Sequence, residues 1–180
     1  MSHSLRLAFS SMITAIGTAI MFLTGLIPIG TYALPALAGI FLIPVVIEIG
    51  INWAFGIFIA ESLLSGFFAP DKEAALCFIL FFGYYPVLKA VLERKLQKRW
   101  MCAIAKYLLF NIALILDFWA TVAILKIPIE TFSVFGAFIP VLFLLAGNVM
   151  FFLYDYALSL LVISYCNKLR HALQKWFHIR

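Results

Sequence analysis

The sequence predicts an all-α protein, a polytopic membrane helix bundle of six transmembrane helices with both termini cytoplasmic. The chain of 180 residues is 66% hydrophobic and only 12% charged, whereas a soluble domain is about half apolar and a quarter charged. Its apolar runs approach the length of about 20 residues that a helix needs to cross the hydrocarbon core. Its basic residues are also distributed unevenly among the connections between these runs.

Six apolar segments meet this description. We expect spans over residues 5–26, 33–48, 51–68, 73–93, 101–125 and 137–165. The second and third spans are separated only by the short segment 47–52, and their fusion would leave five spans with the termini on opposite sides. The first apolar run, from Leu7 to about Ile27, is too long for the h-region of a signal peptide and indicates a retained span.

The basic residues favour six spans over five. With six, eleven of the 13 Lys and Arg residues fall on the side of the termini, and they are densest over residues 94–99. The opposite side holds only Lys72 and Lys126. Because positively charged connections stay in the cytoplasm, both termini are predicted to lie there. Residues 1–166 then form the transmembrane domain, and residues 167–180 form a basic amphipathic tail at the inner interface.

The fourth predicted span contains a break at Gly83 and Pro86. Pro86 has no amide hydrogen to donate and crowds the carbonyl of Phe82, so the helix is expected to kink there. The segment is therefore not a plain membrane anchor, and Tyr84, which lies inside the break, is one of our candidate ligand-binding residues.

Charged and amide side chains inside the predicted spans are costly in a bilayer and usually face protein or a water-filled cavity. They are Glu61, Asn111, Asp117, Asn148 and Asp155, with Glu48 near an inner helix end. One interpretation is a polar cavity open to the outside and covered by the loops 28–32, 69–73 and 127–131. The simpler interpretation is that these groups satisfy one another between helices. For the set as a whole we favour a ligand site, with Glu61, Tyr84, Asp117, Asn148 and Asp155 as the candidate ligand-binding residues.

The sequence lacks the motifs of catalysis, metal binding and nucleic-acid binding. There is no HExxH, GxSxG or P-loop, and Cys77, Cys102 and Cys166 have no CxxC spacing. An intramembrane aspartyl enzyme would need a carboxylate pair, for which Asp117 and Asp155 are candidates by charge alone. The basic residues flank apolar runs rather than forming a patch on a soluble domain. We therefore expect no enzyme, no cofactor, no metal site and no nucleic-acid partner.

The first predicted helix has small residues at four-residue spacing, an arrangement that lets another helix approach closely. The small residues are Ser11, Ala15 and Ala19. Two further features are the first loop, over residues 26–31, and the prolines Pro35 and Pro44 in the second span. In these features, and in its size, the chain resembles the substrate-binding S components of energy-coupling factor (ECF) vitamin transporters. Its segments Pro70-Asp71-Lys72, Phe82-Gly83-Tyr84-Tyr85-Pro86 and Gly147-Asn148-x6-Asp155 are also similar to those of uncharacterised bacterial membrane proteins related to that group.

The resemblance implies a mechanism and a set of partners. A small, vitamin-like nutrient would bind from outside a bacterial plasma membrane, under the loops. The protein would then dock through Ser11, Ala15 and Ala19 onto a transmembrane coupling subunit driven by two ATPase subunits. The later helices carry none of the vitamin-specific signatures, which leaves the ligand open. The alternative is a non-transport membrane protein, either a structural assembly factor or a lipid-handling protein.

Overall fold

Helices account for nearly all of the residues that the structure describes. The structure is a computed structural model in which residues 2–27, 30–96, 98–126, 133–134, 137–138 and 140–169 are described. In this part of the chain, six helices are long and apolar enough to cross a membrane, judged by length and composition. The prediction of an all-α fold with six such helices is confirmed, and the composition of the helices is that of an integral membrane protein.

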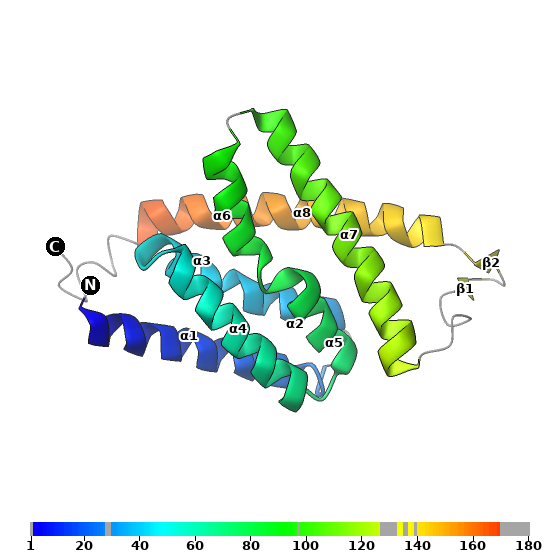
Figure 1. Cartoon of the computed structure of the whole chain (residues 1–180), viewed down its shortest axis with the longest axis horizontal. Coiled ribbons are helices and arrows are strands. Elements are labelled where there is room, and N and C mark those ends of the chain that lie inside the picture. Colours follow the sequence, from blue (N-terminus) through cyan, green and yellow to red (C-terminus); the bar gives the residue numbers. More distant parts are fainter. Residues whose placement is uncertain are drawn as a thin grey trace.

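The first helix, α1 (His3–Leu23), packs lengthwise against α4 (Ile51–Phe68). Ser2 caps α1, because its side-chain oxygen accepts a hydrogen bond from the amide of Leu5. The residues of α1 that are buried against its neighbours recur at helical spacing and include Ile13, Gly17 and Ile20. Figure 1 shows the two helices side by side along one edge of the molecule.

The second span consists of two helices, α2 (Gly30–Ile40) and α3 (Leu42–Glu48). Pro44 cannot donate to the carbonyl of Ile40, which explains why the helix is interrupted at this point. The chain then reverses at Gly50, whose φ of 120° is a conformation that suits glycine alone. The second and third spans are therefore separate, and the fused arrangement is excluded.

The fourth span is broken where the sequence predicts a kink. It consists of α5 (Lys72–Cys77), the π-helix η1 (Phe78–Phe82), a turn, and α6 (Tyr85–Lys95). Pro86 lies in the first turn of α6, where a missing amide hydrogen costs nothing. The Phe82 carbonyl lies directly against Gly39 of α2, where any Cβ would clash with it. The break thus lets two backbones approach closely.

The remaining long helices are α7 (Arg99–Leu125) and α8 (Pro140–Ser164), which the π-helix η3 (Tyr165–Leu169) continues. Between them, β1 (Ser133–Val134) pairs antiparallel with β2 (Ala137–Phe138). The prediction that the last helix begins at residue 137 was wrong. The helix begins at Pro140, because proline is favoured in a first helical turn and unfavourable further inside. The predicted tail lies outside the described residues from residue 170 onward, as does the loop 127–131.

The helix ends fall into two groups in Figure 1. The first group occupies the left and the top of the view. It contains the start of α1, the turn between α3 and α4, the end of α8, and the ends of α6 and α7 that face each other. The turn between α4 and α5 and the end of α7 lie toward the lower right. Successive helices therefore alternate in direction between the two groups, as a polytopic bundle requires.

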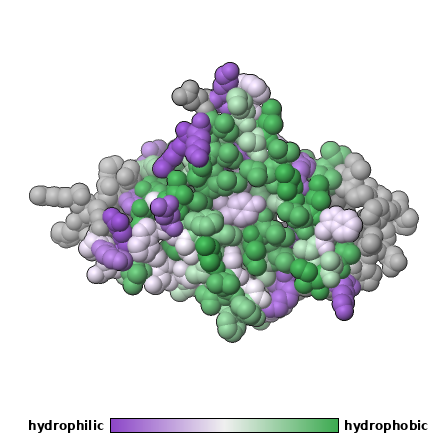
Figure 2. Space-filling model, in the orientation of Figure 1, coloured by the Kyte–Doolittle hydropathy of each residue, from purple (hydrophilic) through white to green (hydrophobic). Residues whose placement is uncertain are grey.

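Apolar side chains cover the outside of the bundle. Figure 2 shows hydrophobic residues across the middle of the visible face, with hydrophilic residues gathered toward the top, the left and the lower right. On α7, large apolar side chains such as Leu108, Ile112 and Trp119 are exposed. An exposed apolar surface of this extent suits contact with lipid rather than water.

Candidate functional site

Asp155 on α8 lies at the centre of a polar network that joins three helices. Its carboxylate accepts a hydrogen bond from the Tyr85 hydroxyl at 2.6 Å and contacts the ammonium groups of Lys89 and Lys106, the latter at 3.3 Å. The Lys89 ammonium also donates to the backbone carbonyl of Asp155 and to the Ser159 hydroxyl, at 2.9 and 2.7 Å. The donors come from α6 and α7, so the network ties both helices to α8.

Glu93 completes this network, which we call the Asp155 network: Tyr85, Lys89, Glu93, Lys106, Asp155 and Ser159. The Glu93 carboxylate lies 2.7 Å from the Lys106 ammonium and 3.5 Å from that of Lys89. Two cations thus face two anions, although both lysines are almost fully buried. Buried charges are tolerated when they are paired and hydrogen-bonded in this way. The predicted ligand residue Asp155 is already satisfied by protein groups.

Asn148, another predicted ligand residue, is also satisfied within the protein. Its side-chain amide forms two reciprocal hydrogen bonds of 3.0 Å with that of Asn111, which joins α8 to α7. Each amide nitrogen donates in addition to a backbone carbonyl of its own helix, those of Leu144 and Tyr107. The arrangement is the interhelical pairing expected of amide side chains buried between membrane helices.

Asp117 lies near the opposite end of α7, apart from the Asp155 network. One of its carboxylate oxygens accepts from the Cys77 thiol at 3.3 Å, and the other is buried without a hydrogen-bond partner among the described residues. Nearby at this end, the hydroxyl of Tyr32 donates to Glu73 at 2.5 Å. Asp117 is therefore the candidate ligand residue at this end that has a carboxylate oxygen without a hydrogen-bond partner in the described part of the chain.

The first and second loops at this end are linked to each other. The Thr31 hydroxyl donates to Asp71 at 2.8 Å, while the other oxygen of Asp71 caps α5 by accepting from two backbone amides. Lys72 folds back onto the carbonyls of Gly66 and Phe67 at the end of α4. Two of the three segments expected to cover a site are thus in contact, and the third lies outside the described residues.

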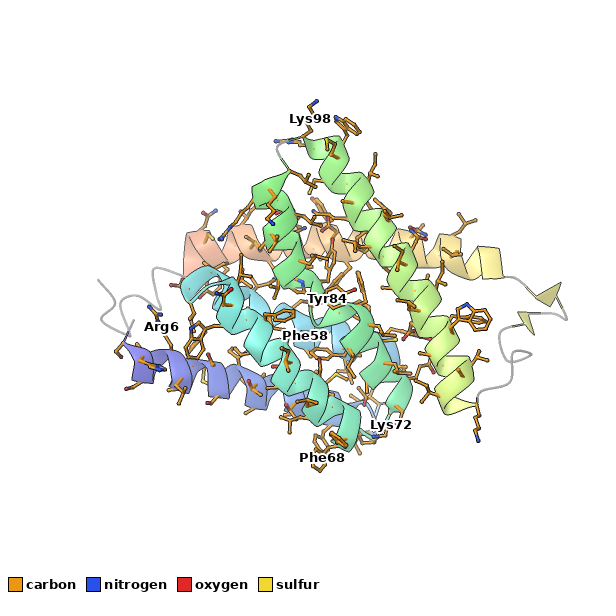
Figure 3. The ribbon with its side chains drawn as sticks, viewed as in Figure 1. Arg6, Phe58, Phe68, Lys72, Tyr84 and Lys98 are labelled. Carbon is orange, nitrogen blue, oxygen red and sulfur yellow. The ribbon has the colours of Figure 1, made fainter. Side chains whose placement is uncertain are left out.

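Tyr84 lies in the turn between η1 and α6. Its ring makes an edge-to-face contact with Phe58 of α4, with centroids 5.8 Å apart, and a second one with Phe81 at 6.4 Å. Figure 3 shows Tyr84 and Phe58 side by side in the middle of the bundle. The preceding Gly83 leaves room for the Phe58 ring, because a Cβ there would lie 2.7 Å from it.

Glu61 lies between α4 and α1, two helices that contribute no residue to the Asp155 network. Its side chain is fully buried, and neither carboxylate oxygen has a hydrogen-bond partner among the described residues. The carboxyl group rests against Gly17 of α1, where a Cβ would lie 2.6 Å from its Cδ atom and 2.9 Å from Oε2. The Glu61 carboxyl group thus packs against α1 at Gly17, with no cation bonded to it among the described residues.

A groove of about 870 Å³ runs along the outer surface between α1 and α4. One wall contains Ser11, Ala15 and Ala19, which are all exposed, and the other contains Gly56 and Ala60. The predicted docking stripe is therefore on the protein surface, and the packing of α1 on α4 uses other residues. We call this feature the α1–α4 groove.

The structure does not bring the five predicted ligand residues together. Glu61 lies at the α1–α4 interface, Tyr84 at the helix break, Asp117 beside Cys77, and Asn148 and Asp155 in two separate pairings. The sequence reasoning missed the burial of Lys89 and Lys106. It counted both as markers of topology and placed Lys106 on one helix face with Asp117, whereas the Lys106 ammonium contacts Glu93 and Asp155. The signal that was available is the four-residue spacing of Tyr85, Lys89 and Glu93, which places all three on one face of α6.

Comparison with known proteins gives no further guide, since the chain has no significant match among protein-family models, curated proteins or solved structures. Within the described ranges, no group of three or more His, Cys, Asp or Glu side chains is placed to hold a metal ion. The function must therefore be argued from the arrangement of these polar groups and the groove.

Proposed function

We propose that the protein is a solute-binding membrane subunit that docks through the α1–α4 groove onto a transmembrane coupling protein of an ATPase-driven importer. The observation that carries the proposal is the exposure of Ser11, Ala15 and Ala19. A stripe used for internal packing would be buried against α4, yet the residues of α1 buried among its neighbours are Ile13, Gly17 and Ile20. Small residues on a lipid-facing surface allow a helix of another protein to approach closely.

The groove has the chemistry of a helix-docking surface. Its lining is mostly apolar. The hydroxyl groups of Ser11 and Thr14, which also line it, donate to carbonyls of their own helix. Asn52 and Trp53 lie at the end of the groove near the start of α4. The occupant that we propose is one transmembrane helix of the coupling protein, lying along both walls.

The solute would bind at the other end of the bundle, from the side opposite the cytoplasm of a bacterial cell. Asp117 is the candidate contact, because one of its oxygens is unpartnered and the linked loops lie close to this end. The distribution of Lys and Arg supports this orientation, because it favours both termini in the cytoplasm. The solute itself is a small nutrient of unassigned chemistry.

A structural or lipid-handling membrane protein is the second candidate. One observation favours it: Asp155 and Asn148, two of the five candidate ligand residues, are already bonded to protein groups. A protein whose buried polar groups mainly join its own helices has the character of a scaffold.

Native mass spectrometry of the gently purified full-length protein separates the two. The importer subunit predicts co-purified ATPase-bearing partners and a retained small molecule. We expect Ala15→Trp to abolish assembly with the coupling protein while the isolated chain still binds its solute. Ala8 provides the matched control, since it is exposed on the same helix outside the groove. Equal loss of assembly in Ala8→Trp, or a wild-type chain with neither partner nor ligand in several detergents, would favour the scaffold.

A further inference from the structure

Glu61 presents an electrostatic problem that the proposed function does not address. Its carboxyl group is fully buried between α1 and α4 without an ion pair or hydrogen bond in the described part of the chain. A bare carboxylate in an apolar membrane-embedded interface is strongly unfavourable. Some cation must therefore neutralise it whenever the two helices are packed as they are here.

Among the residues that the structure describes, no side chain is placed to supply that charge. The elements packed against α4 are α1, α3, α5, η1 and α6. The charged or titratable groups that they carry, leaving aside Cys and Tyr, are His3, Arg6, Glu48, Lys72, Glu73, Lys89, Glu93, Arg94 and Lys95. Arg6 is eleven residues before Gly17, about 16 Å along the helix, Lys72 caps α4, and Lys89 belongs to the Asp155 network.

Three hydroxyl groups lie close to Gly17 and Glu61 along the same two helices. Thr18 follows Gly17 directly, and Ser62 and Ser65 belong to the same two turns of α4 as Glu61. The hydroxyl oxygens of all three are buried and have no partner among the described residues. Buried polar atoms without partners are rare in proteins and call for an explanation. Carboxylate and hydroxyl oxygens are suitable ligands for a hard cation and suitable hydrogen-bond partners for a protonated acid.

The α1–α4 groove lies beside these residues. Thr18 lines the groove, as do Ala60 and Leu64, which flank Glu61 on its own helix. One unpartnered hydroxyl, that of Thr18, therefore belongs to a residue of the groove, and Glu61 is next in sequence to another, Ala60.

We propose that Glu61, together with Thr18 and Ser65, forms an exchangeable binding site for a monovalent cation, H⁺ or Na⁺, which is reached from the α1–α4 groove. The site goes beyond the proposed function and does not depend on it. It requires neither a coupling partner nor a nutrient, and it concerns the charge state of the isolated chain.

The probe is dicyclohexylcarbodiimide, an apolar reagent whose central carbon is attacked by a protonated buried carboxyl group while the proton moves to nitrogen, so that nothing is released. We would treat the full-length protein in lipid nanodiscs and locate the adduct by peptide mass spectrometry. We expect labelling of Glu61 at neutral pH and none of Asp155, whose carboxylate is bonded to Tyr85, Lys89 and Lys106. Above the pKa of Glu61, labelling should fall by roughly tenfold per pH unit.

Sodium distinguishes the two cations. If Na⁺ binds, sodium chloride should protect Glu61 from labelling at constant pH and ionic strength, whereas choline chloride should not. If H⁺ alone binds, both salts should have the same effect and only pH should change the labelling. The proposal is overturned if Glu61 stays unlabelled in the folded protein although the detergent-unfolded chain is labelled. It is equally overturned if labelling is constant between about pH 5 and pH 9 and insensitive to salt.

Two matched variants test the site independently of Glu61 itself. Thr18→Val removes an unpartnered hydroxyl and should shift the pH or Na⁺ dependence of labelling. Thr14→Val also removes a hydroxyl from the groove, but that hydroxyl is bonded to the carbonyl of Ser10, so the dependence should not change. An equal shift in both variants would contradict the assignment of Thr18.

Discussion

Two carboxylates inside the same bundle, the partly buried Asp155 and the fully buried Glu61, have opposite surroundings. Asp155 is held by two lysines and a tyrosine contributed by α6 and α7. Glu61 is more deeply buried and rests against the backbone of Gly17 with no cation in the described surroundings. The first carries its counter-charges within the chain, whereas the second must acquire one.

This difference distinguishes polar groups that hold the helices together from polar groups that can bind something else. A buried ion network that is fully satisfied fixes helices relative to one another and offers nothing to a ligand. An unsatisfied buried acid needs a bound cation, and at Glu61 we propose that this cation exchanges with the surroundings. Because both types of residue look alike in the sequence, only their neighbours tell them apart.

Removing Asp155 should have the largest effect on stability. Asp155→Ala leaves Lys89 and Lys106 facing each other across α6 and α7, with Glu93 as the remaining acid. Loss of one partner from a buried charge network costs about 3–5 kcal/mol. We expect a decrease of that size in the free energy of unfolding, measured by titration with sodium dodecyl sulfate in mixed micelles.

Its control is Glu93→Gln, because the Glu93 side chain is half exposed and water can solvate what remains. The decrease should be much smaller than in Asp155→Ala. If both variants lose the same stability, the network is not centred on Asp155.

A second test concerns the tyrosine that completes the network. Tyr85→Phe removes one hydrogen bond to a charged carboxylate without changing the shape of the ring. Hydrogen bonds to charged groups contribute about 1.5–3 kcal/mol, and we expect a loss in that range in the same titration. Tyr154→Phe is the matched variant, since its hydroxyl lies 3.4 Å from the Ala36 carbonyl. A larger loss at residue 154 than at residue 85 would refute our ranking.

A third test applies to the other carboxylate. Gly17→Ala places a methyl group against the Glu61 carboxyl, and we expect a loss of about 1–2 kcal/mol after allowing for the better helix propensity of alanine. The double variant with Glu61→Ala should recover most of it, since the clash has gone. Gly56→Ala is the control, because a Cβ there meets nothing within 4 Å. Additive effects in the double variant would show that Gly17 and Glu61 do not interact.

The sequence predicted those features of the fold that depend on local chemistry. The span over residues 51–68 and the break at residues 83–86 were both found, because apolar length, glycine and proline act within a few residues. The start of the last helix was misplaced, because Ala137 and Phe138 are as apolar as the helix that follows and pair instead in a short hairpin.

The pairing of the polar side chains could not be predicted in the same way. Tyr85 and Asp155 are 70 residues apart, and the partners of Asn148 and Asp117 are also on other helices. Apolar length shows where a residue lies within a span, but it does not show which residues of other helices are its neighbours. Only the four-residue spacing on α6 indicated that Lys89 faces the same way as Tyr85.

The smallest effect on the free energy of unfolding is expected for Glu61→Gln. Glu61→Gln exchanges a neutralised acid for an amide of nearly the same shape, and no cationic side chain is left unpaired by the change. We expect the free energy of unfolding to change by less than about 0.5 kcal/mol, whereas Asp155→Asn, which halves the negative charge facing two lysines, should cost several times more. If both substitutions cost the same, Glu61 has a cationic partner as firmly held as the lysines of Asp155. Equal costs would therefore mean that the two carboxylates do not differ in kind.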